Sequence, residues 1–454
     1  MLTECRHPRA FTPSPTPPPP YHPPTPAHPI PRPNPPRPRG ACQTESERAT
    51  PLTTKTKPDA PPMNWDTVDR PGVFSSEMLR LAVDAGTIAA PKNDPVADSQ
   101  FQPASLDLRL GATAYRLRSS FLPGAGSTVQ KRLADLQMGQ PLNLDNPDGV
   151  VLERGRPYLI PLVERLNLPP NVRGRTNPRS STGRLDIFTR VITDNGAQFD
   201  QILAGYSGAL WLEVYSNSFT VSVRKGLALA QLRLSGADQT LATDEIRQLH
   251  GSGGLIYEDV GTQRRRIESP NIAGDGLFVS VFLPQKALVG WQARRDSPLL
   301  DLSAENRYRA LDFWDPVTAE PGGRLVLHPE HFYLLISREY VVIPPSVASE
   351  MVAYDPTNGE LRTHYAGFFD PGFGWKPPTQ PAGTRAVLEV RAHDVPFMLE
   401  DAQPVARLAY EHMAAEPQRL YGEAAARSHF QDQGIALSRQ FKPPEFSLSF
   451  PTMT

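Results

Sequence analysis

Hydrophobic and polar residues alternate along much of the chain after position 72, and a period of two is typical of β-strands with one buried face. Residues 102–111 alternate in this way and end at a glycine, and residues 150–170 follow as two more strands. Residues 191–234 continue the pattern between glycine-containing turns. Residues 75–83 instead have the pattern of a capped amphipathic helix. The pattern predicts a mainly β protein with few short helices.

The second half of the chain repeats the first in register. Residues 325–334 match 150–159 at an offset of 175, residues 343–347 match 168–172 at the same offset, and residues 386–390 match 210–214 with one residue of drift. A register held over that distance indicates a duplicated domain. We therefore expect a first β domain at 63–250, a diverged second one at 251–415 and a carboxy-terminal tail at 416–454. Residues 235–266 are expected to be a polar connection.

Residues 1–62 differ in composition from the rest of the chain. They hold 20 of the 51 prolines, which predicts a disordered arm with polyproline II character. Such an arm could dock a partner, but a dispensable extension is favoured, partly because Met63 would make a natural start. The chain shows neither a signal peptide nor an apolar run that could span a bilayer, which predicts a soluble, cytoplasmic protein. The net charge of −1 argues against a nucleic-acid binder.

Residues 179–184 carry the strongest chemical signal in the chain. They read Arg-Ser-Ser-Thr-Gly-Arg, so one turn offers two guanidinium groups, three hydroxyls and free backbone N–H groups to an anion. A polyphosphate is the ligand that best uses all of them. At the same place the second half has Tyr-Asp-Pro-Thr-Asn-Gly at 354–359, a plain turn without an arginine fork. The two copies are therefore expected to be unequal, with the anion bound by the first.

This turn, followed by Gly-Tyr-Ser-Gly at 205–208 and a strand that carries Glu213, resembles the dCTP deaminases of the dUTPase-like superfamily. Further segments of that family resemble residues 102–111 (QPASLDLRLG), 364–372 (HYAGFFDPG) and 429–439 (HFQDQGIALSR), the last being a tail that closes over the nucleotide in relatives. The resemblance implies duplicated dUTPase-like β-barrel or distorted jelly-roll domains. It also implies an enzyme that hydrolyses dCTP to dUTP and ammonia and so feeds dUMP and dTTP synthesis.

The resemblance implies roles for individual residues of the first copy. Glu213 would pass protons between water and the cytosine ring, Ser180 would orient the water or the amino group, and Arg184 would stabilise charge or hold the phosphates. The nucleotide is expected to contact Arg179, Ser181, Thr182, Asp200, Gln231 and Gln433.

The second copy could contribute to a shared pocket, as a neighbouring subunit does in the trimeric relatives. The residues expected to do so are His364, Asp370 and Glu389, and Glu389 is the alternative to Glu213 as the proton shuttle. Asp107, in the first copy, is expected to be a buried strand position rather than a catalytic residue. The resemblance also implies a homo-oligomer, as in a trimer-like assembly of β domains.

Cys5 and Cys42 are the only cysteines in the sequence, and both fall in the proline-rich arm. The chain therefore lacks the ligands of the zinc nucleobase deaminases, and deamination would use side chains and water alone. Mg²⁺ is expected to arrive with the triphosphate, without dedicated protein ligands. Two other functions stay open: a dUTP diphosphatase, alone or combined with the deaminase, which Asp200 would serve, and a nucleotide-binding regulator that has lost catalysis. Arg184 and Glu213 favour the deaminase.

Overall fold

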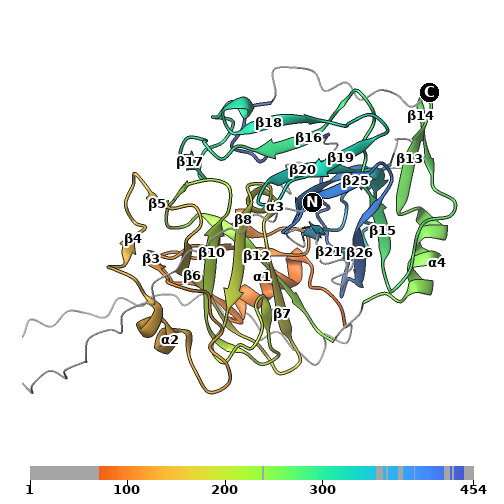
Figure 1. The fold of residues 1–454 in the computed structure, drawn as a ribbon. Coiled ribbons are helices and arrows are strands. Elements are labelled where there is room, and N and C mark those ends of the chain that lie inside the picture. The colour runs from red at the N-terminus through yellow and green to blue at the C-terminus, as the bar shows by residue number, and fades with distance from the viewer. Residues whose placement is uncertain are drawn as a thin grey trace, which may run out of the picture. The chain divides into compact units, whose positions relative to one another are not determined.

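The computed structural model describes residues 71–237, 240–353, 361–363, 367–376, 382–392, 394–423, 430–431 and 434–443. Met1–Pro58 and Asp59–Thr454 form separate units, and the described residues belong to the second unit. The proline-rich arm, the turn at 354–359, His364 and Gln433 lie outside the described residues. The described residues form mostly strands with few short helices, which confirms the predicted fold class (Figure 1). No helix among them is long and apolar enough to cross a bilayer.

The first copy is built on two main sheets, drawn from orange to yellow-green in Figure 1. One has the order β4-β3-β6-β10-β8 with β1 added to β6, and the other has the order β2-β12-β7-β9. The strands of the larger sheet are β1 (Ile88–Ala89), β3 (Thr113–Arg116), β4 (Leu142–Asn143), β6 (Pro157–Asn167), β8 (Ile187–Ile192) and β10 (Ser207–Ser216). Those of the smaller sheet are β2 (Leu106–Arg109), β7 (Arg173–Pro178), β9 (Gln201–Ile202) and β12 (Ala228–Ser235).

The second copy repeats this topology. Its larger sheet has the order β14-β13-β20-β16-β18 with β24 joining β20 and β22, and its smaller sheet has the order β15-β26-β21-β23. The strands of the larger sheet are β13 (Ile256–Val260), β14 (Gln263–Arg266), β16 (Leu288–Ala293), β18 (Trp314–Thr318), β20 (Phe332–Val341), β22 (Leu361–Thr363) and β24 (Thr384–Ala392). Those of the smaller sheet are β15 (Leu277–Ser280), β21 (Val347–Ala353), β23 (Phe368–Phe369) and β26 (Pro404–His412).

Strand register identifies equivalent positions in the two copies. Glu213 of β10 lies opposite Leu159 of β6, and Glu389 of β24 lies opposite Leu334 of β20. The two glutamates therefore occupy the same position in their sheets.

Short elements complete the copies. They are the helices α1 (Ser76–Asp84), η2 (Asp98–Gln100), α2 (Val129–Leu136), α3 (Ser180–Gly183), α4 (Thr243–Gly253) and η3 (Ala310–Asp312), and the strands β5 (Val150–Leu152), β11 (Val221–Val223), β17 (Leu300–Asp301), β19 (Arg324–Leu327) and β25 (Phe397–Glu400). The prediction of a polar connection at 235–266 is wrong, because α4, β13 and β14 fall there. Ile246 of α4 is fully buried, which explains why this polar segment folds as a helix.

One hydrophobic cluster extends from the first copy into the second copy and the tail, and the second copy also has a cluster of its own. Phe219, between β10 and β11, packs edge-on against Trp314 of β18, with ring centroids 5.3 Å apart. Phe441 of the tail packs edge-on against Phe313, with centroids 5.4 Å apart. Because aromatic pairs of this kind contribute large buried areas, the copies and the tail hold one another in place.

Buried charges join the smaller sheets of the two copies. Arg233 of β12 is 2% exposed, and it contacts Asp370 at 3.3 Å and Glu411 of β26 at 3.7 Å. Arg175 of β7 pairs with Glu350 of β21, which also accepts a hydrogen bond from Asn177 at 2.9 Å. Since each of these contacts crosses from one copy to the other, the network fixes how β12 and β7 lie against β21 and β26.

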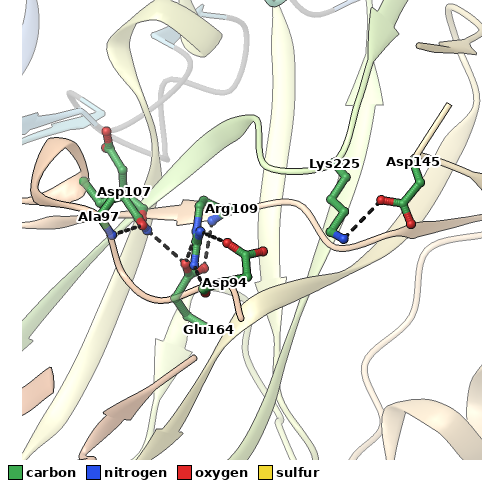
Figure 2. Close-up of polar contacts among 8 residues, drawn as sticks. Asp94, Ala97, Asp107, Arg109, Asp145, Glu164 and Lys225 are labelled. Atoms are coloured by element: carbon green, nitrogen blue, oxygen red, sulfur yellow. Dashed lines mark hydrogen bonds and ion pairs between the residues drawn. The ribbon is translucent and has the colours of Figure 1, made fainter. Parts of the chain in front are cut away.

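A second network fixes β2, the strand that carries Asp107. Figure 2 shows Arg109 between Asp94 and Glu164. The fully buried Glu164 accepts hydrogen bonds from the backbone N–H and side chain of Arg109 at 2.8 and 2.7 Å, and from Gln100 at 2.9 Å. A buried carboxylate with this many donors is satisfied, so the network ties β2 firmly to β6.

Candidate active site

A cleft lies between the two copies, lined by both and by the tail. Its lining residues include Arg179, Ser180, Ser181, Gly183, Arg184 and Gln231 of the first copy, Phe368, Asp370, Phe373, Val387 and Glu389 of the second, and Tyr421 and Phe430 of the tail. The structure therefore brings together residues that are more than half the chain apart.

The arginine–serine turn forms at the end of β7. Pro178 is the last residue of the strand, and Arg179 keeps an extended backbone while its carbonyl accepts hydrogen bonds from the N–H groups of Thr182 and Gly183 at 2.7 and 3.0 Å. The N–H of Arg184 then donates to the Ser180 carbonyl at 3.1 Å. This single helical turn, α3, sets Ser180 and Arg184 on the cleft.

Glu389 reaches the turn from the second copy. A Cβ atom added to Gly183 would lie 2.5 Å from Glu389 Oε2, so the absence of a side chain at Gly183 allows the carboxylate to approach α3. Glu389 Oε2 is buried and has no hydrogen-bond partner among the described residues. Burial raises the pKa of the Glu389 carboxyl well above its usual 4.5, although the neighbouring Arg184 opposes this effect.

Arg184 is buried between Glu389 and the tail. Burial lowers the pKa of its guanidinium to about 10, so it stays charged at neutral pH. The guanidinium stacks over the Phe430 ring at 3.6 Å, and Nη1 donates to the Ala436 carbonyl at 2.8 Å. Ser438 donates to the Ser181 carbonyl at 2.6 Å. The tail thus lies directly against the arginine–serine turn.

Glu213 is not in this cleft, which corrects the prediction that it lies with Ser180 and Arg184. It is 1% exposed and pairs with Arg190 of β8, whose Nε donates to Glu213 Oε1 at 3.0 Å. Cross-strand neighbours share a face, so Glu213 lies on the same side of the sheet as Leu159. Helix α2 covers that side, since its Val129 packs in one cluster with Leu159.

The reason for the error is the duplication itself. The same sheet position carries glutamate in both copies, but of these two glutamates the described part of the structure places Glu389, not Glu213, in the cleft with the arginine–serine turn. A signal was present in the sequence, because the H-x-A…D-P-G segment that resembles the family stands in the second copy. Arg190 holds the position opposite Glu213.

The other end of the cleft is polar and carries opposite charges. Arg179, Ser181 and Gln231 line it together with Asp107, whose carboxylate lies 3.2 Å from Arg179 Nε. Burial raises the pKa of the Asp107 carboxyl to about 6, although Arg179 opposes this effect. The sequence pattern predicts that Asp107 is a buried strand position. Asp107 is buried, and it also lines the cleft.

Two of the predicted contacts lie elsewhere. Thr182 is buried and does not line the cleft, because its position in α3 turns it towards the interior. Asp200 does not line the cleft either: its carboxylate accepts hydrogen bonds from the Thr176 hydroxyl at 2.7 Å and the Val191 N–H at 2.8 Å. The aromatic lining residues Tyr421 and Phe430 had no chemical signal in the sequence beyond the resemblance of the tail. In the described part of the chain, no group of three or more His, Cys, Asp and Glu side chains could hold a metal ion.

Comparison with known proteins gives matches over both copies. Residues 70–238 match the family described as "2'-deoxycytidine 5'-triphosphate deaminase (DCD) N-terminal domain", and residues 243–441 match the family of the corresponding "C-terminal domain". The crystal structure of 2'-deoxycytidine 5'-triphosphate deaminase from Agrobacterium tumefaciens is similar, with a TM-score of 0.69 and 41% sequence identity, over 76% of this chain and 99% of that one.

Shorter relatives match less than half of the chain. The "dCTP deaminase, dUMP-forming" of Streptomyces avermitilis is 30% identical over 165 residues, which are 35% of this chain and 78% of the relative. The "dCTP deaminase" of Natronomonas pharaonis is 29% identical over 200 residues, which are 43% of this chain and 95% of the relative.

Proposed function

The chain belongs to the 2'-deoxycytidine 5'-triphosphate deaminase family and is a dCTP deaminase, and we propose that it forms dUTP and ammonia in one cleft per chain. The observation that carries this proposal is that Ser180 and Arg184 of the first copy line the same cleft as Glu389 of the second. Neither copy has the whole set: the second lacks the arginine–serine turn in its sequence, and the first pairs its own glutamate, Glu213, with Arg190. The site is therefore proposed to need both copies.

Glu389 is proposed as the proton shuttle. The reaction replaces the amino group of cytosine by an oxygen from water, so one group must accept a proton and then donate it. A carboxyl whose pKa is raised by burial suits this alternation near neutral pH. Glu389 would take a proton from the attacking water and deliver it to the ring nitrogen beside the reacting carbon. A second transfer, from the added hydroxyl to the amino group, then releases ammonia and leaves the carbonyl of dUTP.

Ser180 and Arg184 are proposed to prepare this step. The Ser180 hydroxyl, on the first residue of α3, would orient the water or the amino group by a hydrogen bond. Arg184 stays charged beside Glu389, so it would stabilise the deprotonated carboxylate that receives the proton.

The opposite end of the cleft is proposed to bind the triphosphate. Arg179 offers a planar guanidinium there, and Ser181 and Gln231 add uncharged donors. Asp107 and Asp370 line the same end, each paired with an arginine, so Mg²⁺ would come with the triphosphate and be held by its oxygens without dedicated protein ligands. Such an ion would neutralise part of the phosphate charge.

Further hydrolysis to dUMP is the second candidate, because the relative from Streptomyces avermitilis is named dUMP-forming. That step needs a carboxylate that can activate water beside the phosphates. Asp200 does not line the cleft, and the two aspartates that do are ion-paired, Asp107 with Arg179 and Asp370 with Arg233. These pairings support dUTP as the product.

The proposal is tested by incubating the purified chain with dCTP and Mg²⁺ and separating the nucleotides while ammonia is assayed. We expect dUTP and ammonia in equal amounts, no pyrophosphate, and loss of both products in Arg184→Ala. Formation of dUMP and pyrophosphate would establish the second candidate. Release of ammonia only in the presence of stoichiometric zinc, measured by elemental analysis, would overturn the proposed chemistry.

A further inference from the structure

A buried ion pair joins the two copies directly beside the cleft. Asp186 Oδ2 of the first copy accepts a hydrogen bond from Arg391 Nη2 of the second at 2.5 Å. Asp186 is 0% exposed, and the Arg391 side chain is 16% exposed. A pair this well buried is screened little by solvent, so its charges act on their surroundings.

Each member of the pair follows a proposed site residue by two positions. Asp186 comes two residues after Arg184, and Arg391 comes two residues after Glu389 on β24. Because side chains alternate along a strand, Arg391 and Glu389 share one face of the sheet. The pair therefore connects the segment of Arg184 to the strand of Glu389.

Asp186 is itself held firmly in the first copy. Its backbone has a φ of 57°, and its carboxylate also accepts a hydrogen bond from the Ser218 hydroxyl at 2.6 Å. The N–H of Asn217 donates to the Asp186 carbonyl at 3.0 Å. By strand register, Tyr215 of the first copy is equivalent to Arg391 of the second. The first copy therefore lacks an arginine at this position, and duplication alone does not explain the pair.

We propose that the Asp186–Arg391 pair is an intercopy clamp that positions the Glu389 carboxylate against Arg184, and this inference rests on the proposed role of Glu389. Several other groups face Glu389 or line the same cleft: Arg184 from α3, Asp370 from the segment after β23, and Tyr421 from the tail. The clamp adds a negative and a positive charge to this set. Its net charge is zero, so removing either member alone changes the field at Glu389.

The two members should shift the titration of Glu389 in opposite directions. Asp186→Asn leaves Arg391 unpaired, which favours the deprotonated carboxylate and moves the Glu389 limb of the kcat–pH profile to lower pH by about 0.5–1 unit. Arg391→Gln removes the positive charge of the pair and keeps the negative charge of Asp186, which moves the same limb to higher pH. The double variant should return the limb close to its original position. Each single variant should lower kcat about 10- to 100-fold while KM for dCTP changes little, because the carboxylate is misplaced.

Arg391→Lys keeps the charge and should keep the limb in place, and it carries the test together with Asp186→Asn if Arg391→Gln fails to fold. Arg224→Gln is the matched control, since it breaks another intercopy ion pair, with Asp301 at 3.2 Å, outside the cleft. In this variant the Glu389 limb of the kcat–pH profile should not move. Limbs that stay in place, or that move in the same direction in both single variants, would overturn the clamp. An inactive wild-type chain would instead overturn the proposed function.

Discussion

At the scale of single residues, one glutamate position has two different fates in the same chain. Glu213 and Glu389 occupy equivalent places in equivalent strands. Arg190 pairs with Glu213, whereas Glu389 lies next to Arg184 and lines the cleft. Each glutamate keeps one buried oxygen without a hydrogen-bond partner among the described residues, so their different neighbours, not this feature, distinguish them.

The pair of glutamates offers a matched experiment. Glu389→Gln should lower kcat by about two to four orders of magnitude with little change in KM for dCTP, because the amide cannot shuttle a proton. Glu213→Gln should retain turnover and lose stability, because Arg190 would lose its charged partner. Steady-state kinetics and thermal denaturation of both variants provide the measurement. Near-normal turnover in Glu389→Gln would contradict the assignment.

Asp107 allows a prediction about stability and pH. Its pKa is about 6 in the folded chain against an ordinary 3.8, so the folded chain binds a proton more tightly than the unfolded one. The free energy of unfolding should therefore fall as the pH rises from about 4 to 6 and then level off. Asp107→Asn removes this pH-dependent decrease. It should therefore raise the free energy of unfolding at pH 8 by at most about 3 kcal/mol and have little effect on it near pH 4.

The control for this prediction is the exposed Asp148, since Asp148→Asn should leave the stability unchanged at both pH values. Calorimetric melting of the ligand-free protein at pH 4 and pH 8 makes the comparison. A lower melting temperature for Asp107→Asn at pH 8 would mean that the ion pair with Arg179 outweighs the burial of the carboxylate.

At the scale of elements, the alternation of hydrophobic and polar residues predicts the strands well, but it does not predict the helices that pack against them. The strands predicted at 150–170 are β5 and β6, and the helix predicted at 75–83 is α1. Helices α2 and α4 were missed, because short polar helices have a weak periodic signal and are stabilised by tertiary packing. The packing of α2 against Leu159 depends on contacts that strand periodicity does not encode.

The buried charges between β12 and β26 lead to a prediction about how the copies are held together. Arg233→Met should lower the free energy of unfolding by about 3–5 kcal/mol, because Asp370 and Glu411 would keep buried charges without a cation. Arg116→Met is the matched control: its side chain is 35% exposed and forms one surface pair with Glu153, so its loss should cost less than about 1 kcal/mol. Urea denaturation of both variants gives the comparison. Equal losses would show that the intercopy charges do not hold the copies together.

At the scale of the whole molecule, two copies of one fold have divided a single site between them. The first copy keeps the arginine–serine turn, and the second keeps the glutamate that faces it. The sequence predicts the duplication and the unequal turns, and it contains signals for site residues in both copies. It did not show which copy's glutamate meets the turn, because that depends on how two sheets pack rather than on any local pattern.

This division predicts one nucleotide site per chain, whatever the number of chains in the assembly. Titration of a non-hydrolysable dCTP analogue by calorimetry should give a stoichiometry of one, since only one arginine–serine turn is present in the sequence. Arg184→Ala and Arg179→Ala should each weaken binding strongly, because charge-assisted hydrogen bonds to phosphate or base would be lost. Arg265→Ala removes an exposed arginine of the second copy and should leave both affinity and stoichiometry unchanged. A stoichiometry of two, with the second site unaffected by Arg184→Ala, would mean that the diverged copy binds nucleotide without an arginine fork.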